Sequence, residues 1–374
     1  MITTARGYTT RAAGPADNAG LVALAASSPM EAGLAICVRR EPDFFALNRL
    51  EGDRWDVGVA EGPGGDVVGC IGVAERLAFV HGGARRTAYI GDLKVHPAHR
   101  GHGVADDLSR YVRQVCSEIG GDDLPCLLTA LAGNRGVERR LSGPRGLPEL
   151  RRFATVRSYA IPLFLPRREP RQDQYWVRRA TAADVEEMAC LWRSVARERQ
   201  FAPVQDVADL HAPGLSIEDY WLAHRPGTGR LAAFVALWDQ HSFKRTHVLR
   251  YGARFGALRQ LLNVAAPLFS APRLPPPGAG GGMPLRQVAA FQVAAPASEP
   301  AALRSLLEHA YAEYRRSRYV LMTIGLDVRD PLSRALDGLM AIPTTLHAYV
   351  TTPAGVYRGP DLGDRPLHFE TALV

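Results

Sequence analysis

Residues 91–105, GDLKVHPAHRGHGVA, combine the residue types that a pyrophosphate site requires. Gly101 and Gly103 have no Cβ, so the backbone there can turn tightly and approach an anion closely. Arg100 adds a fixed positive charge and a fork of N–H donors that suits phosphate. The segment therefore predicts the binding of a phosphate-bearing ligand.

Such a loop needs a strand that leads into it and a helix that leads out of it. Ala88–Val95 is a β-like run, and Pro97 falls where a strand must stop. A helix that starts near Gly103 would direct its unpaired N–H groups and the positive end of its dipole at the ligand. Apolar residues recur at helical spacing from there to about Ile119, namely Val104, Leu108, Tyr111, Val112 and Val115.

The segment Val95–Ala105 resembles the acyl-CoA loop of the GNAT superfamily of acyl-CoA-dependent N-acyltransferases. The family pattern is Gln or Arg, two residues, Gly, one residue, then Gly or Ala. Arg100 fits its head, and Gly103 and Ala105 fit its small positions. The resemblance implies a GNAT fold for residues 1–165, acetyl-CoA or another acyl-CoA as co-substrate, and a backbone amide near Val95 for the thioester carbonyl. It assigns to CoA binding Leu93, Val95, Arg100, Gly101, His102, Gly103, Val104, Ala105 and Asn134.

Acyl transfer from a thioester to an amine needs a base for the attacking ammonium. Asp92 is the first candidate, because it lies on the strand that would run beside the thioester, where the family often has a carboxylate. Glu75, on the preceding strand, is the competitor. Another interpretation of Asp92 stays open, namely a strand carboxylate that faces solvent or pairs with an arginine.

The family's usual acid is a tyrosine on the helix after the next strand, and this chain departs from that pattern. Asn134 follows the strand as the family predicts, but residues 135–144 contain no tyrosine. Tyr159, in an expected closing strand, is the substitute candidate. The alternative is a thiolate that leaves without a dedicated acid, since its proton affinity is modest.

Phe44 and Phe45 are the candidates for binding the acceptor, because they lie where the family's variable helices wall the acceptor pocket. The alternative is an aromatic pair that is half core and half interface. His96, His99 and His102 are expected to make local hydrogen bonds and to add positive character near the phosphates. No group of His, Cys, Asp and Glu has metal-ligand spacing, so no metal is expected.

The composition of the 374 residues, 47% hydrophobic and 22% charged, is typical of a soluble globular protein. The net charge is +7, but of 45 basic residues only Lys94 and Lys244 are lysines, so the bias toward arginine indicates a GC-rich genome rather than a nucleic-acid partner. Five scattered cysteines without CxxC spacing favour a reducing compartment. Without a membrane-length apolar segment or a signal peptide, a cytoplasmic protein is expected. The sequence leaves the choice between monomer and homodimer open.

The length allows two domains. We expect an α/β protein of two tandem GNAT-like domains, each a mixed central sheet flanked by helices. The expected boundaries are a catalytic domain at residues 1–166, a polar linker at 167–174 and a second copy at 175–374, with a Pro/Gly-rich loop at 272–284.

The evidence for a second copy is a weak internal repeat. Tyr175–Asp184 echoes Tyr8–Asp17, since both are an aromatic-led strand with a basic residue, a small polar turn and an Asp before a helix. In the second copy, the segment Ala294–Pro300 has two prolines and no glycine pair, so it lacks the donors of a pyrophosphate loop. The second copy is therefore expected to be degenerate.

These observations predict an N-acyltransferase that moves an acetyl or other acyl group from acyl-CoA to a primary amine. The acceptor is a small molecule or a peptide, and the amine attacks directly in a ternary complex. No membrane or nucleic-acid partner is expected. We expect each chain to bind one CoA. Two alternatives stay open, namely a non-catalytic acyl-CoA-binding sensor and a longer-chain acyltransferase of secondary metabolism.

Overall fold

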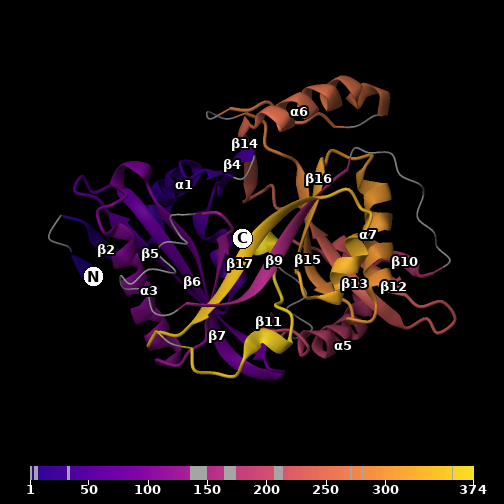
Figure 1. Ribbon diagram of the computed structural model, residues 1–374, viewed down its shortest axis with the longest axis horizontal. Helices are drawn as coiled ribbons and strands as arrows, with labels where there is room; N and C mark the ends of the chain where they lie inside the picture. The colour runs from indigo at the N-terminus through magenta and orange to yellow at the C-terminus, as the bar shows by residue number, and fades with distance from the viewer. Residues whose placement is uncertain are drawn as a thin grey trace.

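The computed structural model describes residues 2–3, 7–31, 34–134, 150–163, 174–205, 214–269, 272–278, 282–355 and 357–374. In these residues one mixed sheet of fourteen strands runs through the whole molecule, and a three-stranded sheet accompanies it. Figure 1 shows the N-terminal half on the left and the C-terminal half on the right of the long sheet. None of the described helices combines the length and the apolar character that crossing a bilayer requires.

Each half contributes strands to the long sheet and helices that cover it. The N-terminal half provides β1 (Ile2–Thr3), β2 (Thr9–Ala12), β5 (Arg54–Glu61), β6 (Val67–Val80), β7 (Gly83–Val95), β8 (Cys126–Leu131), β9 (Arg151–Pro162), α1 (Asn18–Ala26), α2 (Asn48–Glu51) and α3 (Val104–Gly120). The C-terminal half provides β10 (Trp176–Arg179), β11 (Ala202–Pro203), β12 (Tyr220–His224), β13 (Leu231–Trp238), β15 (Gln287–Ala294), β16 (Leu321–Asp327), β17 (Ile342–Thr351), α5 (Val185–Ala196), α6 (Ala253–Ala265) and α7 (Pro300–Tyr314).

The two halves exchange their last strands. The strand order at the centre is β8-β17-β9-β16, so β17 of the C-terminal half lies between two N-terminal strands. Conversely, β9 pairs with β16, with Tyr159 opposite Ile324. The tandem GNAT-like architecture is thus confirmed, but the two expected sheets are one continuous sheet. The linker expected at 167–174 lies outside the described residues except for Gln174.

The weak internal repeat corresponds to one local structure that occurs twice. Both terminal nitrogens of Arg11 donate hydrogen bonds to the Asp17 carboxylate at 2.8 Å. Both terminal nitrogens of Arg178 donate in the same way to the Asp184 carboxylate, at 2.8 and 2.6 Å. In each copy the same carboxylate accepts the backbone N–H three residues earlier, at 2.7 Å from Gly14 and 2.8 Å from Thr181. An arginine and an aspartate six residues apart therefore fix the turn from first strand to first helix in both halves.

Helix α3 is capped at both ends by glycines with left-handed φ, Gly103 (φ 85°) before it and Gly121 (φ 79°) after it. Its apolar face packs on the sheet as the periodicity predicts, with Val104, Leu108 and Val112 buried. Asp106 and Asp107 in its first turn complement the positive end of the helix dipole. This packing fixes the direction in which the first turn of α3 points.

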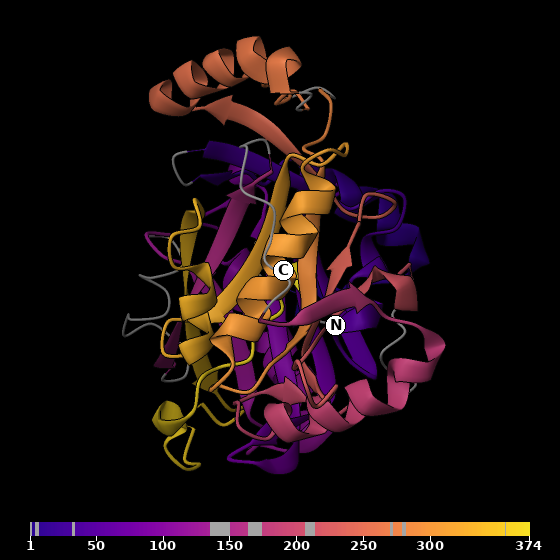
Figure 2. The ribbon, with the colours of Figure 1, turned by 90° about the vertical axis from the view of Figure 1, so that its right-hand side faces the viewer.

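The three-stranded sheet joins the two halves a second time. It consists of β3 (Met30–Glu31), β4 (Leu34–Arg39) and β14 (Arg245–Tyr251), with Cys37 opposite His247. Figures 1 and 2 show β14 and the following helix α6 at one end of the molecule, apart from α5 and α7. The described part of the Pro/Gly-rich loop is tied to α6, because the Asn263 side chain bonds both the N–H and the carbonyl of Leu274.

Candidate active site

The site opens where two parallel strands separate. β7 pairs with β8 only over Ala88–Ile90, although the two strands continue to Val95 and Leu131. Beyond Ile90 their facing edges diverge, and both line a cavity of about 1690 Å³. An unpaired strand edge offers N–H and C=O groups to an extended ligand. The opening therefore suits a linear molecule that lies along β7.

The predicted phosphate loop lines this cavity. Gly101 and Gly103 both have left-handed backbone, at φ 80° and 85°, and a Cβ built on either would point into open space. Arg100 donates its Nε to the carbonyl of Val95 at 3.2 Å, which ties the loop to the end of β7. The first N–H groups of α3 thus face the cavity from one side while the β7 edge faces it from another.

Eight of the nine residues assigned to CoA line the cavity: Leu93, Val95, Arg100, Gly101, Gly103, Val104, Ala105 and Asn134. The exception is His102, which is exposed. Its Nδ1 lies 3.0 Å from the Arg100 carbonyl, and its ring centroid lies 5.9 Å from that of Tyr8. His102 therefore stiffens the loop from outside and does not face the ligand space.

Asp92 lies at a β-bulge in β7. Its φ is 55°, and the register with β6 shifts between Cys70 and Gly72. A bulge puts an extra residue in one strand, which bends the strand and redirects a side chain. The redirected Asp92 carboxylate lines the cavity.

Asp92 is held between two cations. Arg40, which is 3% exposed, donates to one carboxylate oxygen, and Lys94 Nζ lies 2.5 Å from the other. The Asn48 side-chain oxygen accepts a hydrogen bond from a second Arg40 nitrogen at 2.9 Å. The Arg40 guanidinium lies 4.1 Å from the Phe44 ring centroid. Burial alone would raise the pKa of Asp92, but Arg40 and Lys94 outweigh it and hold the pKa well below its usual range.

This geometry corrects the expected role of Asp92. A carboxylate whose pKa is lowered by two cations is a weak proton acceptor, so it is poorly suited to take a proton from an ammonium. The alternative of an aspartate paired with an arginine is what the structure shows. Asp92 acts here as the counter-charge that fixes Arg40 and Lys94 in the cavity wall.

Glu75 and Tyr159 do not lie among the cavity-lining residues that the described chain provides. Glu75 is buried opposite Ala88 and pairs with Arg86, whose Nε lies 3.1 Å from its carboxylate. Tyr159 packs against the core of the C-terminal half, because its neighbours Ser158 and Ala160 take the cavity side of β9. Neither residue is placed to exchange a proton with a ligand in the cavity.

Phe44 and Phe45 are core residues rather than pocket residues. They are 0% and 8% exposed and meet edge to face at 5.9 Å between centroids. Phe45 also packs on Trp55, at 5.7 Å. Phe44 affects the site only through its ring contact with Arg40.

For the expected acyl transfer, we predict that Tyr159→Phe leaves turnover within about twofold of wild type, because Tyr159 packs against the core of the C-terminal half and is not among the residues that line the cavity. Steady release of free CoA over the full pH range would check this. A fall of tenfold or more, with unchanged thermal unfolding, would show that the hydroxyl does reach the cavity.

Residues of both halves complete the cavity wall. Aliphatic side chains of β4, β14 and α6 form an apolar roof, which we define as Leu34, Ile36, Val38, Val248, Leu258 and Leu262. Gln240 and Lys244, just before β14, and Thr371 add polar side chains, and Leu373 and Val374 also line the cavity. Sequence reasoning missed all of these, although one signal was present, since Lys94 and Lys244 are the only lysines of the chain and both line this cavity.

The second copy keeps the β-bulge, but there a side chain of the same half bonds the backbone N–H. Gln292 on β15 has φ 49°, and the register with β13 shifts beside it, as at Asp92. Its backbone N–H donates to the Glu370 carboxylate at 3.1 Å, and Glu370 in turn pairs with His368 at 2.8 Å. The backbone group that a ligand would need is therefore already occupied.

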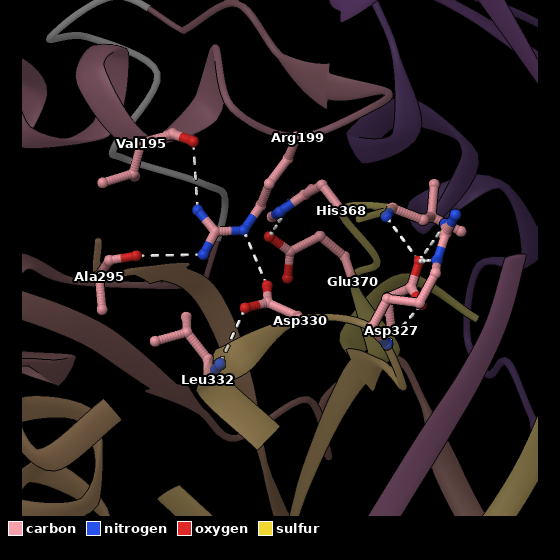
Figure 3. Close-up of polar contacts among 10 residues, drawn as sticks. Val195, Arg199, Ala295, Asp327, Asp330, Leu332, His368 and Glu370 are labelled. Carbon is pink, nitrogen blue, oxygen red and sulfur yellow. Dashed lines mark hydrogen bonds and ion pairs between the residues drawn. The ribbon is translucent and has the colours of Figure 1, made fainter. Parts of the chain in front are cut away.

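The loop of the second copy is filled in the same way. Figure 3 shows the buried Arg199 guanidinium donating to the Ala295 and Val195 carbonyls, each at 3.1 Å, and to Asp330 at 3.0 Å. Glu299 at the start of α7 adds a carboxylate that pairs with Arg225. The polar groups around this loop are thus paired with one another, and Pro296 and Pro300 offer no N–H donors, so the loop is poorly suited to hold an anion.

Comparison with known proteins agrees with this geometry. Residues 30–135 match the acetyltransferase (GNAT) family. A search of curated proteins finds no match. Among solved structures, a GCN5-related N-acetyltransferase from Sphaerobacter thermophilus is similar at 15% identity and TM-score 0.61, over 97% of this chain and 99% of that one.

Two further structures share the fold. The N-myristoyltransferase of Saccharomyces cerevisiae with bound myristoyl-CoA is similar at 12% identity and TM-score 0.62, over 98% of this chain and 85% of that one. The glucosamine N-acetyltransferase region of a fungal multi-domain β-N-acetylglucosaminidase matches at 14% identity and TM-score 0.58, over 93% of this chain and 38% of that one. At such identities the likeness shows the fold alone.

Proposed function

Because the chain carries a domain of the GNAT acetyltransferase family, we propose that it transfers an acyl group from acyl-CoA to a primary amine. The observation that supports this most strongly is the joint placement of the phosphate loop and the open β7 edge on one cavity. The pyrophosphate of CoA would lie on the start of α3, and its extended arm along β7. The thioester would then lie near Val95, beside Asp92 and Lys94.

The size of the cavity supports a mechanism in which both substrates bind at the same time. Ligand pockets commonly measure about 300–1,000 Å³, and the cavity here is about 1690 Å³. Direct attack of the amine on the thioester requires such a shared space. In the described residues, Cys116 and Cys126 line the cavity, and the contact with Cys116 together with burial holds the pKa of the Cys126 thiol well above its usual range. Cys70 on β6 lies outside the lining, its Sγ donates to the Asp92 carbonyl, and burial raises the pKa of its thiol to about 12. A thiol of that kind is a poor nucleophile, which favours direct attack over an acyl-enzyme.

A second candidate is transfer of a longer acyl chain, and the apolar roof favours it. Its six aliphatic residues would accept either an alkyl chain on the thioester or an apolar acceptor. An acetyl group alone would leave most of this surface without a partner. The two candidates share the loop, the strand edge and the chemistry.

The experiment that tests both is a turnover matrix of acetyl-, butyryl-, octanoyl- and myristoyl-CoA against a panel of primary amines and N-terminal peptides. We expect amine-dependent release of free CoA, with the product mass increased by the acyl group. The preferred chain length then separates acetyl transfer from long-chain transfer. Binding of every acyl-CoA without any amine-dependent release would show instead the non-catalytic sensor.

A further inference from the structure

Lys244 is one of the two positions at which this chain has a lysine rather than an arginine. Among 45 basic residues only Lys94 and Lys244 are lysines, and they come from opposite halves of the molecule to line the same cavity. Arginine stays charged at any accessible pH, whereas a buried lysine can lose its proton. The chain, which has arginine at its other basic positions, thus retains lysine at two positions that line this cavity.

Anchoring residues 372–374 accounts for Lys244 only in part. Its side chain is 7% exposed, and its Nζ donates to the backbone oxygens of Ala372 and Val374 at 2.9 and 2.5 Å. Gln240 Nε2 already donates to the Ala372 oxygen at 2.8 Å, so that carbonyl has a donor without the lysine. A neutral amine has two N–H groups and one lone pair, so two backbone acceptors leave the lone pair available.

The charged groups that act on Lys244 are Arg40, Glu51, Asp92 and Lys94, all from the N-terminal half. Burial lowers its pKa most, Arg40 and Lys94 lower it further, and Asp92 and Glu51 raise it, so that the pKa falls to about 7. Asp92 is already committed to Arg40 and Lys94. Glu51 is itself buried, with a pKa raised to about 8 by burial and by Asp92, so it is largely uncharged at neutral pH.

We propose that Lys244 accepts the proton of the acceptor ammonium, an assignment that rests on the proposed acyltransferase function. The neutral Nζ takes one proton, and the freed amine forms a C–N bond to the thioester carbonyl. The C–S bond then breaks, and the thiolate takes the second nitrogen-bound proton and leaves as the thiol of CoA. Lys244 returns its proton to water, so one proton is released per turnover.

Because the chain has only two lysines, the protonation of Lys244 can be measured directly. In protein labelled with ¹³C only at lysine, a carbon–proton spectrum contains two side-chain Cε signals, and Lys94→Arg assigns them. We expect the Lys244 signal to titrate near pH 7 in the intact protein. A Lys244 signal that keeps its charged position above about pH 9 would overturn the proposal.

Kinetic variants test the same group through its chemistry. Lys244→Arg keeps a donor and a charge but cannot release a proton, so we expect kcat at pH 7 to fall by about 100-fold or more with little change in the KM for acyl-CoA. The loss should shrink as pH approaches the pKa of the free amine, because the acceptor then needs no base. Arg245→Lys, next along the chain and outside the cavity, is the matched control and should keep wild-type kinetics.

Two outcomes separate this proposal from its alternatives. If Lys244→Arg retains activity within about threefold of wild type and the same pH profile, the lysine is an anchor for residues 372–374. If wild-type protein acylates none of the amines tested, the proposed function fails, while the lysine titration still reports on the site. Acyl-CoA binding by calorimetry and thermal unfolding of each variant exclude misfolding as the cause.

Discussion

Gly103→Val is expected to abolish measurable acyl-CoA binding while the protein still folds. Gly103 has φ 85°, where a β-branched residue costs about 1–3 kcal/mol of strain. The substitution also places a side chain where the first N–H groups of α3 must meet a phosphate. Loss of two charge-assisted hydrogen bonds, at about 1.5–3 kcal/mol each, predicts a weakening of at least about 100-fold.

The matched control for Gly103→Val lies at the other end of the same helix. Gly121 has φ 79°, and a Cβ there also points into open space, but the residue does not line the cavity. Gly121→Val should therefore lower stability by a similar amount and leave binding unchanged. Calorimetry with acetyl-CoA should show one site per wild-type chain, because Glu370, Arg199 and Glu299 fill the second copy. Two sites, or full binding by Gly103→Val, would contradict the loop assignment.

Asp92→Asn is expected to lower both stability and turnover. The variant leaves Arg40, which is 3% exposed, without the carboxylate that neutralises it. Breaking a buried pair from one side costs about 3–5 kcal/mol, and the lower end applies here because the Asp92 side chain is 19% exposed. Turnover should fall as well, since Arg40 and Lys94 lose their fixed positions in the cavity wall.

The effect of Asp92→Asn has a defined pH dependence. The folded-state pKa of Asp92 lies below its unfolded value of about 3.9, so its stabilising contribution is complete above that value. The stability difference between wild type and variant should stay constant above about pH 5 and decrease as pH falls below about 4. Denaturant unfolding at several pH values measures it.

A double-mutant cycle makes this prediction specific. Arg40→Met combined with Asp92→Asn removes both charges, and the pair should be less destabilised than the sum of the single variants. Asp184→Asn is the control, because it breaks a similar ion pair with Arg178 away from the cavity. It should lower stability without changing acyl-CoA binding. Additive effects of Arg40→Met and Asp92→Asn would show that the two side chains are not coupled.

The features predicted correctly depend on neighbours in the sequence. The tight turn at the loop glycines, the helix that follows and the missing glycine pair at 294–300 all follow from local backbone chemistry. The repeat at Arg11–Asp17 and Arg178–Asp184 is local as well, since each pair spans six residues. Short-range patterns of this kind survive in any tertiary context that keeps the strand and the helix.

The incorrect assignments concern partners that are distant in the sequence. Arg40 lies 52 residues from Asp92, and nothing in either segment indicates the other. Glu75 and Tyr159 have suitable side chains but lie away from the cavity, which depends on how the strands are ordered in the sheet. Helix α6 was not identified from the sequence, although Leu258 and Leu262, four residues apart, both line the cavity.

By itself, then, the sequence determined where an acyl-CoA could lie in one half and why the other half lacks such a loop, since both depend on glycines, prolines and a helix start. The tertiary structure alone decided what faces that ligand. Exchange of β9 and β17 makes one sheet of two halves, and pairing of β4 with β14 closes an apolar roof over the loop. These contacts join residues far apart in the chain, so they bring Lys244 to Asp92 where no local pattern could indicate it.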